Sequence, residues 1–417
     1  MEATGQSANA PFEVTDRFNP FSADYLADPY PILSDVREAA SVFYSADLDH
    51  WVVTRYSEVR QVLRTSANFS AVNALEPLTK LCPRAMAVLK DGQYAATPAL
   101  TNLDPPGHAR QRRLVNAAFT PKRIEGLEPF IRDVAARFCD ERFHDGRADM
   151  IRDLAWALPV LVLFRILGLP ESDLVRVKEG ARYRGVVLFG RANEEEQIGA
   201  ARELASFWQY ASTLIDRRTE RPSDDFISAL VHAGDGATDS LTREELTTIM
   251  LQMLFAGHET TTNLLGNSFR RLLADPPSWE AICHDPGLIP NAIEEVLRFD
   301  SSVIAWRHKT KQEVEIGDVR VPADAKLLLL LGSANRDPAV FPNPDHFDIR
   351  RPNAREHLSF GFGPHNCLGA PLARLEARVV LEEVSRRLPT LRLAEDARLD
   401  FPASISMRGP RALPVVW

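Results

Sequence analysis

Residues 360–369 read Phe360-Gly361-Phe362-Gly363-Pro364-His365-Asn366-Cys367-Leu368-Gly369, and a helical pattern follows from Ala370 to Leu388. The sulfur of Cys367 therefore precedes a helix, where unpaired backbone N–H groups and the positive end of the helix dipole favour a thiolate. The glycines let the backbone turn tightly and approach a flat ligand closely. We interpret this as a loop in which Cys367 binds haem iron; a buried cysteine beside an ordinary helix cap is the alternative.

The bulk composition is typical of one large domain. The 417 residues are 45% hydrophobic and carry a net charge of −8, so a nucleic-acid surface is not indicated. No linker or repeat divides the sequence, and we expect a single domain over residues 1–417, with residues 1–20 as an unstructured tail. No stretch has the length and apolarity of a membrane span.

The cysteines and the first residues bear on the cellular compartment. The segment from Met1 to Asn9 lacks the pattern of a signal peptide. The cysteines are too widely spaced for a disulfide framework or for a zinc or iron–sulfur site: Cys82, Cys139, Cys283 and Cys367. We expect a soluble, cytoplasmic enzyme of bacterial type.

Periodicity predicts a mainly α fold with small satellite sheets. Helices are expected at 30–39, at 56–64 and over much of 107–275, and the stretch 65–106 is irregular. Strands are expected at 42–44, 50–54, 314–321 and 326–331, and a hairpin at 404–417.

A long helix with a weak centre is the second motif. Thr242 and Glu245 have the spacing of a capping box, and the helical pattern continues to about Ala274. Its middle, Ala256-Gly257-His258-Glu259-Thr260-Thr261-Thr262, is poor in helix formers. Glu259 and Thr260 are the candidate catalytic pair, because an acid and a hydroxyl beside a small-residue gap can deliver protons to a small ligand. A solvated helix face is the alternative, and His258 is expected to face outward.

Charged residues suggest one ion pair and one anion site. Glu295 and Arg298 are three apart on a predicted helix from Pro290 to Phe299, where a surface pair is the ordinary outcome. Cations that would satisfy the two carboxylates of a buried haem are available elsewhere in the chain: His108, Arg112, Arg307 and His365.

Together these residues resemble cytochrome P-450, the haem-thiolate monooxygenase family, in its soluble bacterial form. The resemblance covers nearly the whole chain and implies that Cys367 is the proximal iron ligand. It makes Glu259 and Thr260 the acid–threonine pair of the oxygen side and Glu295–Arg298 a buried structural pair. The implied haem-binding residues are His108, Arg112, Arg307 and His365 for the propionates, with Ala256, Gly257, Phe360, Gly361 and Gly369 around the ring.

The resemblance also implies an activity. The expected reaction inserts one oxygen atom of O₂ into a C–H bond of a hydrophobic small molecule, with O-dealkylation or epoxidation as variants. It uses haem b and two electrons from a ferredoxin or flavodoxin and its reductase, and the protein is expected to be a monomer. Arg110, Arg112 and Arg113 are a candidate face for an acidic ferredoxin, and an ordinary solvated helix accounts for these arginines equally well. The implied substrate pocket contains Val72, Gln252, Phe255, Val303, Ile304, Ser406 and Met407.

One departure from the family pattern stands out. The segment Pro344-Asp345-His346-Phe347 has histidine where the family usually has arginine, which leaves open a third partner for Glu295 and Arg298. A weaker likeness, in 44–56, 305–307 and 351–353, points to haem domains fused to a reductase. The sequence carries no reductase pattern, so we expect electrons from a separate protein.

Three other functions remain open. A peroxide-driven haem-thiolate enzyme or isomerase would not need the Glu259–Thr260 pair. A haem-binding sensor or carrier would leave the long 65–106 segment without a role. A hydrolase with Cys367 as nucleophile and His365 as base would contain no haem.

Overall fold

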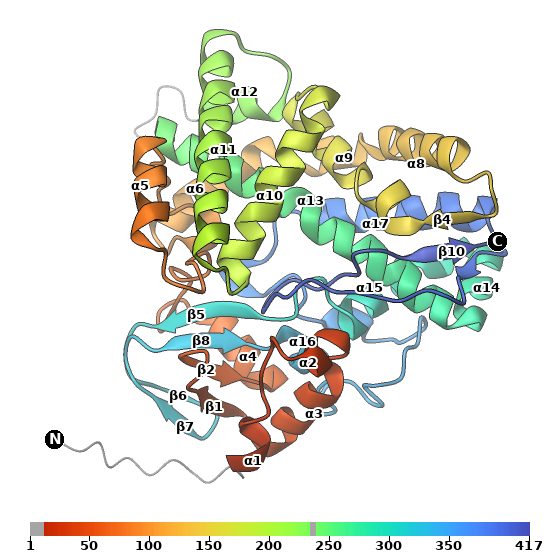
Figure 1. The fold of residues 1–417 in the computed structure, drawn as a ribbon, viewed down its shortest axis with the longest axis horizontal. Helices are drawn as coiled ribbons and strands as arrows, with labels where there is room; N and C mark the ends of the chain where they lie inside the picture. The colour runs from red at the N-terminus through yellow and green to blue at the C-terminus, as the bar shows by residue number, and fades with distance from the viewer. Residues whose placement is uncertain (1–11, 234–238) are drawn as a thin grey trace.

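The computed structural model describes residues 12–233 and 239–417. Helices make up most of this part of the chain, and a smaller region of strands and short helices lies below them in Figure 1. The predicted mainly α architecture with small sheets is confirmed. The helices of the large body are α5 (Pro83–Asp91), α6 (Gly107–Ala118), α7 (Pro121–Glu125), α8 (Glu128–Arg142), α9 (Leu158–Leu167), α10 (Leu174–Phe189), α11 (Glu194–Glu220), α12 (Phe226–Val231), α13 (Arg243–Ala274), α14 (Pro276–His284), α15 (Ile289–Phe299) and α17 (Ala370–Arg387).

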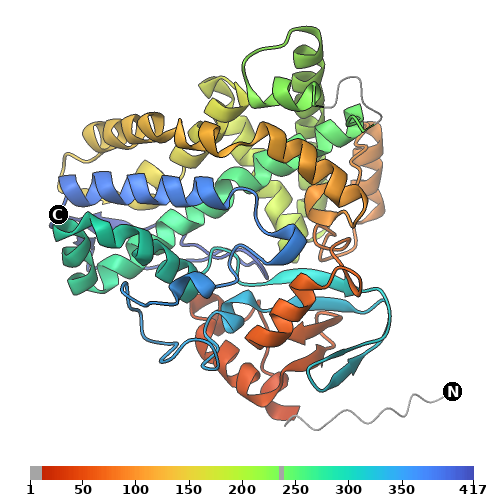
Figure 2. The same cartoon turned by 180° about the vertical axis from the view of Figure 1, so that it is seen from behind.

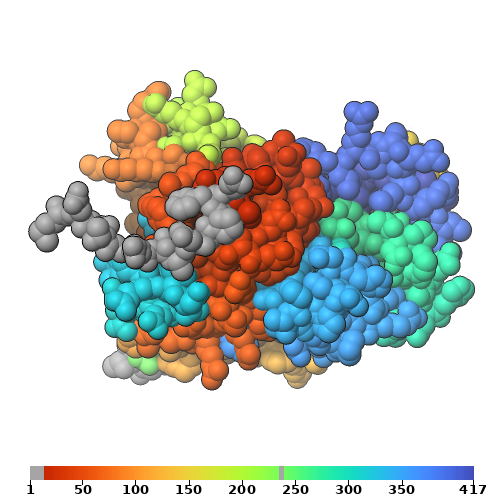
Figure 3. Space-filling view, turned by 90° about the horizontal axis from the view of Figure 1, so that it is seen from below, coloured from red at the N-terminus to blue at the C-terminus, as the bar shows by residue number. Residues whose placement is uncertain are grey.

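The smaller region is built on a five-stranded sheet in the order β1-β2-β8-β5-β3. Its strands are β1 (Val42–Ser45), β2 (His50–Val53), β3 (Phe69–Ser70), β5 (Trp306–Thr310) and β8 (Lys326–Leu329). Short helices accompany it: α1 (Phe12–Thr15), α2 (Ala23–Ala27), α3 (Tyr30–Ala39), α4 (Tyr56–Arg64) and α16 (Leu331–Ala334). Figure 3 shows this side of the molecule, with residues near the N-terminus between the region around 320 (cyan) and the region around 350 (blue).

The predicted C-terminal hairpin is wrong. β10 (Pro414–Val416) pairs antiparallel with β4 (Arg147–Asp149) and with β9 (Arg392–Leu393). The earlier part of the segment instead forms a bridge between Met407 and Val303. Local sequence indicates extended backbone, but its distant pairing partners are set by the packing of the whole chain. The hairpin predicted over 314–321 is present as β6 (Val314–Ile316) and β7 (Val319–Val321).

α13 is the central element. Thr242 and Glu245 form the predicted capping box, each side chain bonding the other's backbone N–H. The helix crosses the body beneath α10 and α11 (Figure 1) and packs against α9, α15 and α17. Seen from behind, α17 lies beside α8 (Figure 2), and these helices share the largest hydrophobic core. A helix in this position has almost no solvated face, so an exposed residue near its centre is a candidate for ligand binding.

Residues 12–20 of the segment predicted as an unstructured tail are partly structured. Residues 1–11 lie outside the described part, but α1 follows them, and Phe18 is buried against the rings of Tyr25 and Phe43. Among the described residues, no helix has the length and hydropathy needed to cross a membrane.

Candidate active site

The Cys367 loop is shaped by two left-handed glycines. Gly361 and Gly363 have φ of 70° and 71°, a region that other residues rarely adopt. A Cβ on Gly363 would also lie 2.7 Å from the carbonyl oxygen of Leu63 in α4. Gly369 has φ of −79°, so conformation does not require glycine there. The loop closes where the Cys367 N–H donates to the carbonyl of Phe360 at 2.8 Å.

Cys367 is accessible to solvent although protein surrounds it closely. Its side chain is exposed, yet burial raises the pKa of the thiol. Backbone N–H groups of Gly369 and Ala370 and the guanidinium of Arg112 act in the opposite direction and favour the thiolate. The backbone donors expected at the start of the helix are therefore present, but burial raises the pKa of the thiol by more than they lower it. A bound metal cation would favour the deprotonated sulfur.

The centre of α13 is also accessible at one position. Ala256 is exposed, although Leu254 and Phe255 just before it are buried. The hydroxyl of Thr260 donates to the carbonyl of Ala256 at 3.0 Å, so the side chain lies along this small-residue gap. Gly257 has a different role, because a Cβ there would be 3.1 Å from Leu163 of α9. Close packing of α9 on α13 accounts for this glycine.

Glu259 is held by a lysine that was not singled out from the sequence. Lys178 of α10 lies 3.1 Å from Glu259 Oε2 and is itself buried. Burial raises the pKa of Glu259, but the ammonium of Lys178, helped by His258 when charged, outweighs it and lowers the pKa overall. The acid is therefore ionised at neutral pH in this arrangement. From the sequence alone, Lys178 is expected to be an ordinary solvated residue of a helix. Its burial follows only from the contact between α10 and α13.

His258 does not face outward, and that prediction is wrong. Its ring is fully buried, with Nε2 3.7 Å from Glu259 Oε2. Among the described residues, neither ring nitrogen has a hydrogen-bond partner. Burial, together with Lys178, lowers the pKa of His258 to about 3, so the imidazole is neutral. The outward orientation fails because α13 is covered on this side by other helices.

Three of the four predicted propionate ligands share one electrostatic cluster. The rings of His108 and His365 lie 4.1 Å apart, centroid to centroid. Burial, then His365 and Arg112, lower the pKa of His108 to about 4. His308 of β5 is a further member; burial and then His365 lower its pKa to about 4. A bound anion would raise the pKa of these histidines, because its negative charge would favour their protonated forms. His308 was not predicted from the sequence, although it directly follows the predicted ligand Arg307.

Arg307 lies apart from this cluster. Its Nη2 donates to the carbonyls of Ala74 and Leu188, both at 3.0 Å, and its Nε has no partner among the described residues. Burial lowers the pKa of Arg307 to about 10, with Glu76 as the opposing charge. Consecutive strand residues point to opposite faces, so Arg307 and His308 point away from each other.

The predicted buried pair is present with a third partner. The Arg298 Nε and Nη2 atoms lie 2.7 and 2.8 Å from the two Glu295 oxygens, and both side chains are fully buried. Arg351 Nε lies 3.1 Å from each Glu295 oxygen. His346 contributes its backbone carbonyl, which accepts from Arg351 at 2.8 Å. The arginine missing at position 346 is thus supplied by position 351.

Most of the residues predicted to line the substrate pocket take part in contacts between segments of the chain. Gln252 bonds the 99–102 segment, accepting from the Thr101 N–H at 3.3 Å, so its amide ties this loop to α13. The 303–305 and 405–407 segments hold each other through the Ile304 N–H and the Ser406 carbonyl at 2.8 Å. Phe255 is buried and Val72 is exposed.

The donor set tests which metal group fits. Within the described part of the chain, no group of three or more His, Cys, Asp or Glu side chains is placed to hold a metal ion. A metal bound by Cys367 therefore needs its other ligands from a cofactor. A flat macrocycle with two carboxylates meets this need, given the exposed sulfur, the gap at Ala256 and the His108–His365 cluster.

Comparison with known proteins gives the same result. The sequence model of the cytochrome P-450 family matches residues 202–285 and 287–398. The chain is 36% identical over 405 residues to mycinamicin IV hydroxylase/epoxidase of Micromonospora griseorubida, covering 96% of this chain and 98% of that protein. It superposes on cytochrome P-450 CREJ in complex with (4-ethylphenyl) dihydrogen phosphate with TM-score 0.93 and 37% identity, covering 96% and 99% of the two chains.

A further structural neighbour bears on the weaker likeness. An intact type IV self-sufficient cytochrome P-450 monooxygenase matches with TM-score 0.93 and 38% identity, over 97% of this chain and 53% of that chain. The predicted similarity to haem domains of fused forms is confirmed. The chain belongs to the cytochrome P-450 family of monooxygenases, whose cofactor is thiolate-ligated haem.

Proposed function

We propose that this enzyme hydroxylates a hydrophobic small molecule, with Cys367 as the iron ligand and a ferredoxin and its reductase as the electron source. The observation that carries the proposal is that Cys367 is exposed and that Ala256, in the small-residue centre of the otherwise largely buried α13, is exposed as well. Haem, when bound, supplies the chemistry of dioxygen activation and oxygen transfer. The protein's own residues hold that group, exclude water and move protons.

Binding of the cofactor is assigned to the cation cluster. His108, Arg112 and His365 are placed to bind propionates, and the backbone donors at Gly369 and Ala370 support the Cys367 sulfur. Arg307 remains a candidate, because its guanidinium has donors beyond the Nη2 bonds it already makes.

Proton delivery is assigned to Glu259 and Thr260. The hydroxyl of Thr260 donates its hydrogen bond to the Ala256 carbonyl. It can rotate and donate to a ligand beside Ala256 instead when one is bound there. Glu259 is ionised beside Lys178, so it must leave that contact to carry a proton inward. This pair favours an oxygen-activating enzyme over a peroxide-driven one, because a peroxide-driven reaction brings its own protons.

A second surface is a candidate for the electron donor beside the Arg110–Arg113 face. It is a cleft of about 500 Å³ that lies against the Cys367 loop. The charged lining of this cleft contains three arginines and one acid: Arg60, Arg355, Arg374 and Glu356. Arg374 and Arg355 lie 2.7 and 3.7 Å from the buried carboxylate of Glu294, and Arg113 and Arg110 are likewise paired, with Asp239 and Glu245. The excess of guanidinium groups in the cleft would be complementary to an acidic ferredoxin.

The test is a reconstituted reaction. Purified protein, ferredoxin, reductase and a hydrophobic compound should give a hydroxylated product that carries one atom of ¹⁸O₂. The first compounds to try are mycinamicin IV and 4-ethylphenyl phosphate, named with the relatives above. Product formed with hydrogen peroxide, and none with the redox partners, would replace this proposal by the peroxide-driven alternative.

A further inference from the structure

An arginine without an acidic partner is buried in α10. Arg184 is 7% exposed, and its Nε and Nη1 atoms have no hydrogen-bond partner among the described residues. No carboxylate in this part of the chain pairs with it; burial lowers its pKa, and Tyr94 is the opposing group. Burying a cation without an anion costs free energy. Native proteins therefore pair a buried cation with an acidic side chain or place it where an anionic ligand binds.

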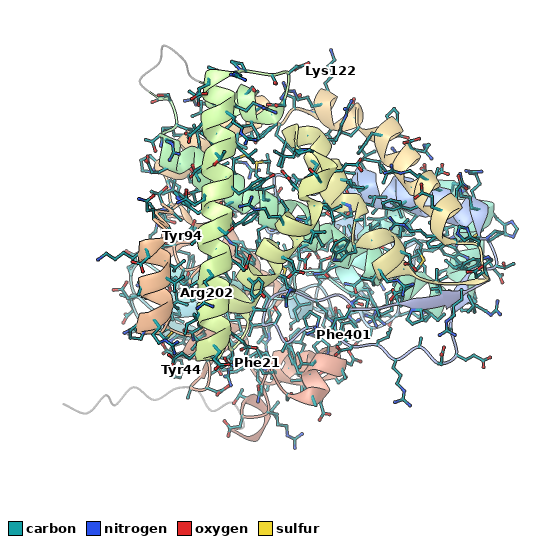
Figure 4. All side chains as sticks on the ribbon, turned by 45° about the horizontal axis from the view of Figure 1, so that its top comes forward. Phe21, Tyr44, Tyr94, Lys122, Arg202 and Phe401 are labelled. Carbon is teal, nitrogen blue, oxygen red and sulfur yellow. The ribbon has the colours of Figure 1, made fainter. Side chains whose placement is uncertain are left out.

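The surroundings of Arg184 are aromatic and lead to the gap in α13. Its guanidinium carbon lies 5.6 Å from the ring centroid of Phe255, the residue before exposed Ala256. Phe255 stacks on Phe189, at 6.3 Å between centroids and 26° between planes. Tyr94, labelled in Figure 4, interacts electrostatically with Arg184 and packs against Trp208 of α11. Arg184 therefore sits where α10, α13 and the 65–106 segment meet.

A second buried arginine lies at the far end of the aromatic pair. The Arg307 guanidinium is 5.5 Å from the Phe189 ring, and no carboxylate of the described residues forms an ion pair with it. Both ends of the Phe255–Phe189 stack are thus positively charged. Aromatic faces favour a hydrophobic ligand, and guanidinium groups favour an oxyanion, which they bind in bidentate fashion.

We propose that Arg184 binds an oxyanion of the substrate, a carboxylate or phosphate carried by a hydrophobic body that packs on Phe255 and Phe189. This inference rests on the proposed function and adds the charge of the substrate to it. It revises the expectation of a purely hydrophobic ligand.

The experiment compares matched ligands on the holoenzyme. 4-Butylbenzoate and the neutral 4-butylbenzamide are titrated while the low- to high-spin shift of the haem is recorded, and 4-ethylphenyl phosphate represents phosphates. We expect the benzoate to bind at least about tenfold more tightly than the amide. Arg184→Met should abolish this preference, and Arg184→Lys should retain part of it. Either anion showing the preference supports the proposal and identifies which oxyanion is favoured.

The control is Arg182→Met, which removes the same charge from the same helix at an exposed position paired with Glu179. It should leave the preference unchanged. Equal loss in both variants, or no preference in the wild type, would overturn the proposal. Failure of the proposed function gives a different result, because the preference in the spin shift would then persist while the reaction reconstituted with ferredoxin and reductase gave no product. Absence of a spin shift with all three ligands would overturn the proposal. Since Arg184→Met removes an unpaired buried cation, its ligand-free melting temperature should be unchanged or higher; a large drop would show that the guanidinium has a structural partner and contradict the proposal.

Discussion

The ammonium of Lys178 lies 3.1 Å from the carboxylate of Glu259, and it joins α10 to the open centre of α13. The lysine is buried, so the contact is only weakly screened by water. It holds Glu259, the proposed proton donor, in its ionised form. Movement of α10 on ligand binding would therefore change the protonation of Glu259 directly.

Replacing Lys178 by Met should raise the pKa of Glu259. Burial raises this pKa and the lysine lowers it, so removal of the lysine leaves burial to dominate and takes the value above 4.5. Difference infrared spectra against Glu259→Gln would follow the carboxyl titration, and Lys178→Arg should keep it low. An unchanged titration in Lys178→Met would show that the contact does not control the acid.

Thr260→Ala should separate binding from proton delivery. The variant removes the hydroxyl that lies along the gap at Ala256 without filling that gap. We expect normal haem content and ligand spin shift, about tenfold less product per electron, and a matching rise in hydrogen peroxide. The measurement is product and peroxide formed per NADH consumed. Thr261→Ala, one position further on, is the control; equal product yield in both variants would contradict the role of Thr260.

Arg351→Met should destabilise the protein. Glu295 is fully buried between Arg298 and Arg351, and removal of one partner from such a network costs about 3 kcal/mol or more. Thermal melting should show a clear drop, with loss of haem at lower temperature. Arg350→Met changes the exposed neighbouring arginine and should have little effect. Similar melting temperatures for the two variants would remove Arg351 from this network.

Glu294 should make the stability dependent on acid pH. Burial raises its pKa, but bonds from His357 and Arg374 outweigh burial and lower it to about 2, from a usual value of 4.5. A folded-state pKa below the unfolded one stabilises the protein above about pH 4.5, and this contribution is lost as pH falls toward 2; it is worth ~3 kcal/mol. Glu294→Gln should therefore be less stable at neutral pH, and denaturant titrations should converge with the wild type near pH 2. A constant difference across this range would contradict the assignment.

Much of the fold was readable from local pattern. The helices at 30–39 and 56–64 and the capped helix from Thr242 match α3, α4 and α13, because caps and periodicity act within a few residues. The C-terminal hairpin was predicted wrongly, because β10 takes its partners from β4 and β9, which are distant in sequence. Strand pairing of that kind depends on which surfaces the other elements leave open.

The site shows the same division. Cys367, Glu259 and the Glu295–Arg298 pair stand in motifs that the sequence displays directly. Lys178 and Arg184 are single charges on an ordinary helix, and their burial depends on how α10 lies on α13. His258 was misjudged for the same reason. Residues that act through contacts between helices leave no local signature in the sequence.

The central claim is that Cys367 binds haem iron through a thiolate. The most direct test is the absorption spectrum of the reduced protein with carbon monoxide, in the wild type and in Cys367→Ser. Thiolate ligation predicts a strongly red-shifted Soret band in the wild type and its absence in the variant. The same substitution at Cys139, a buried cysteine of α8, should leave the band in place. A wild-type spectrum without the shifted band, or a shifted band that survives in Cys367→Ser, would contradict the account.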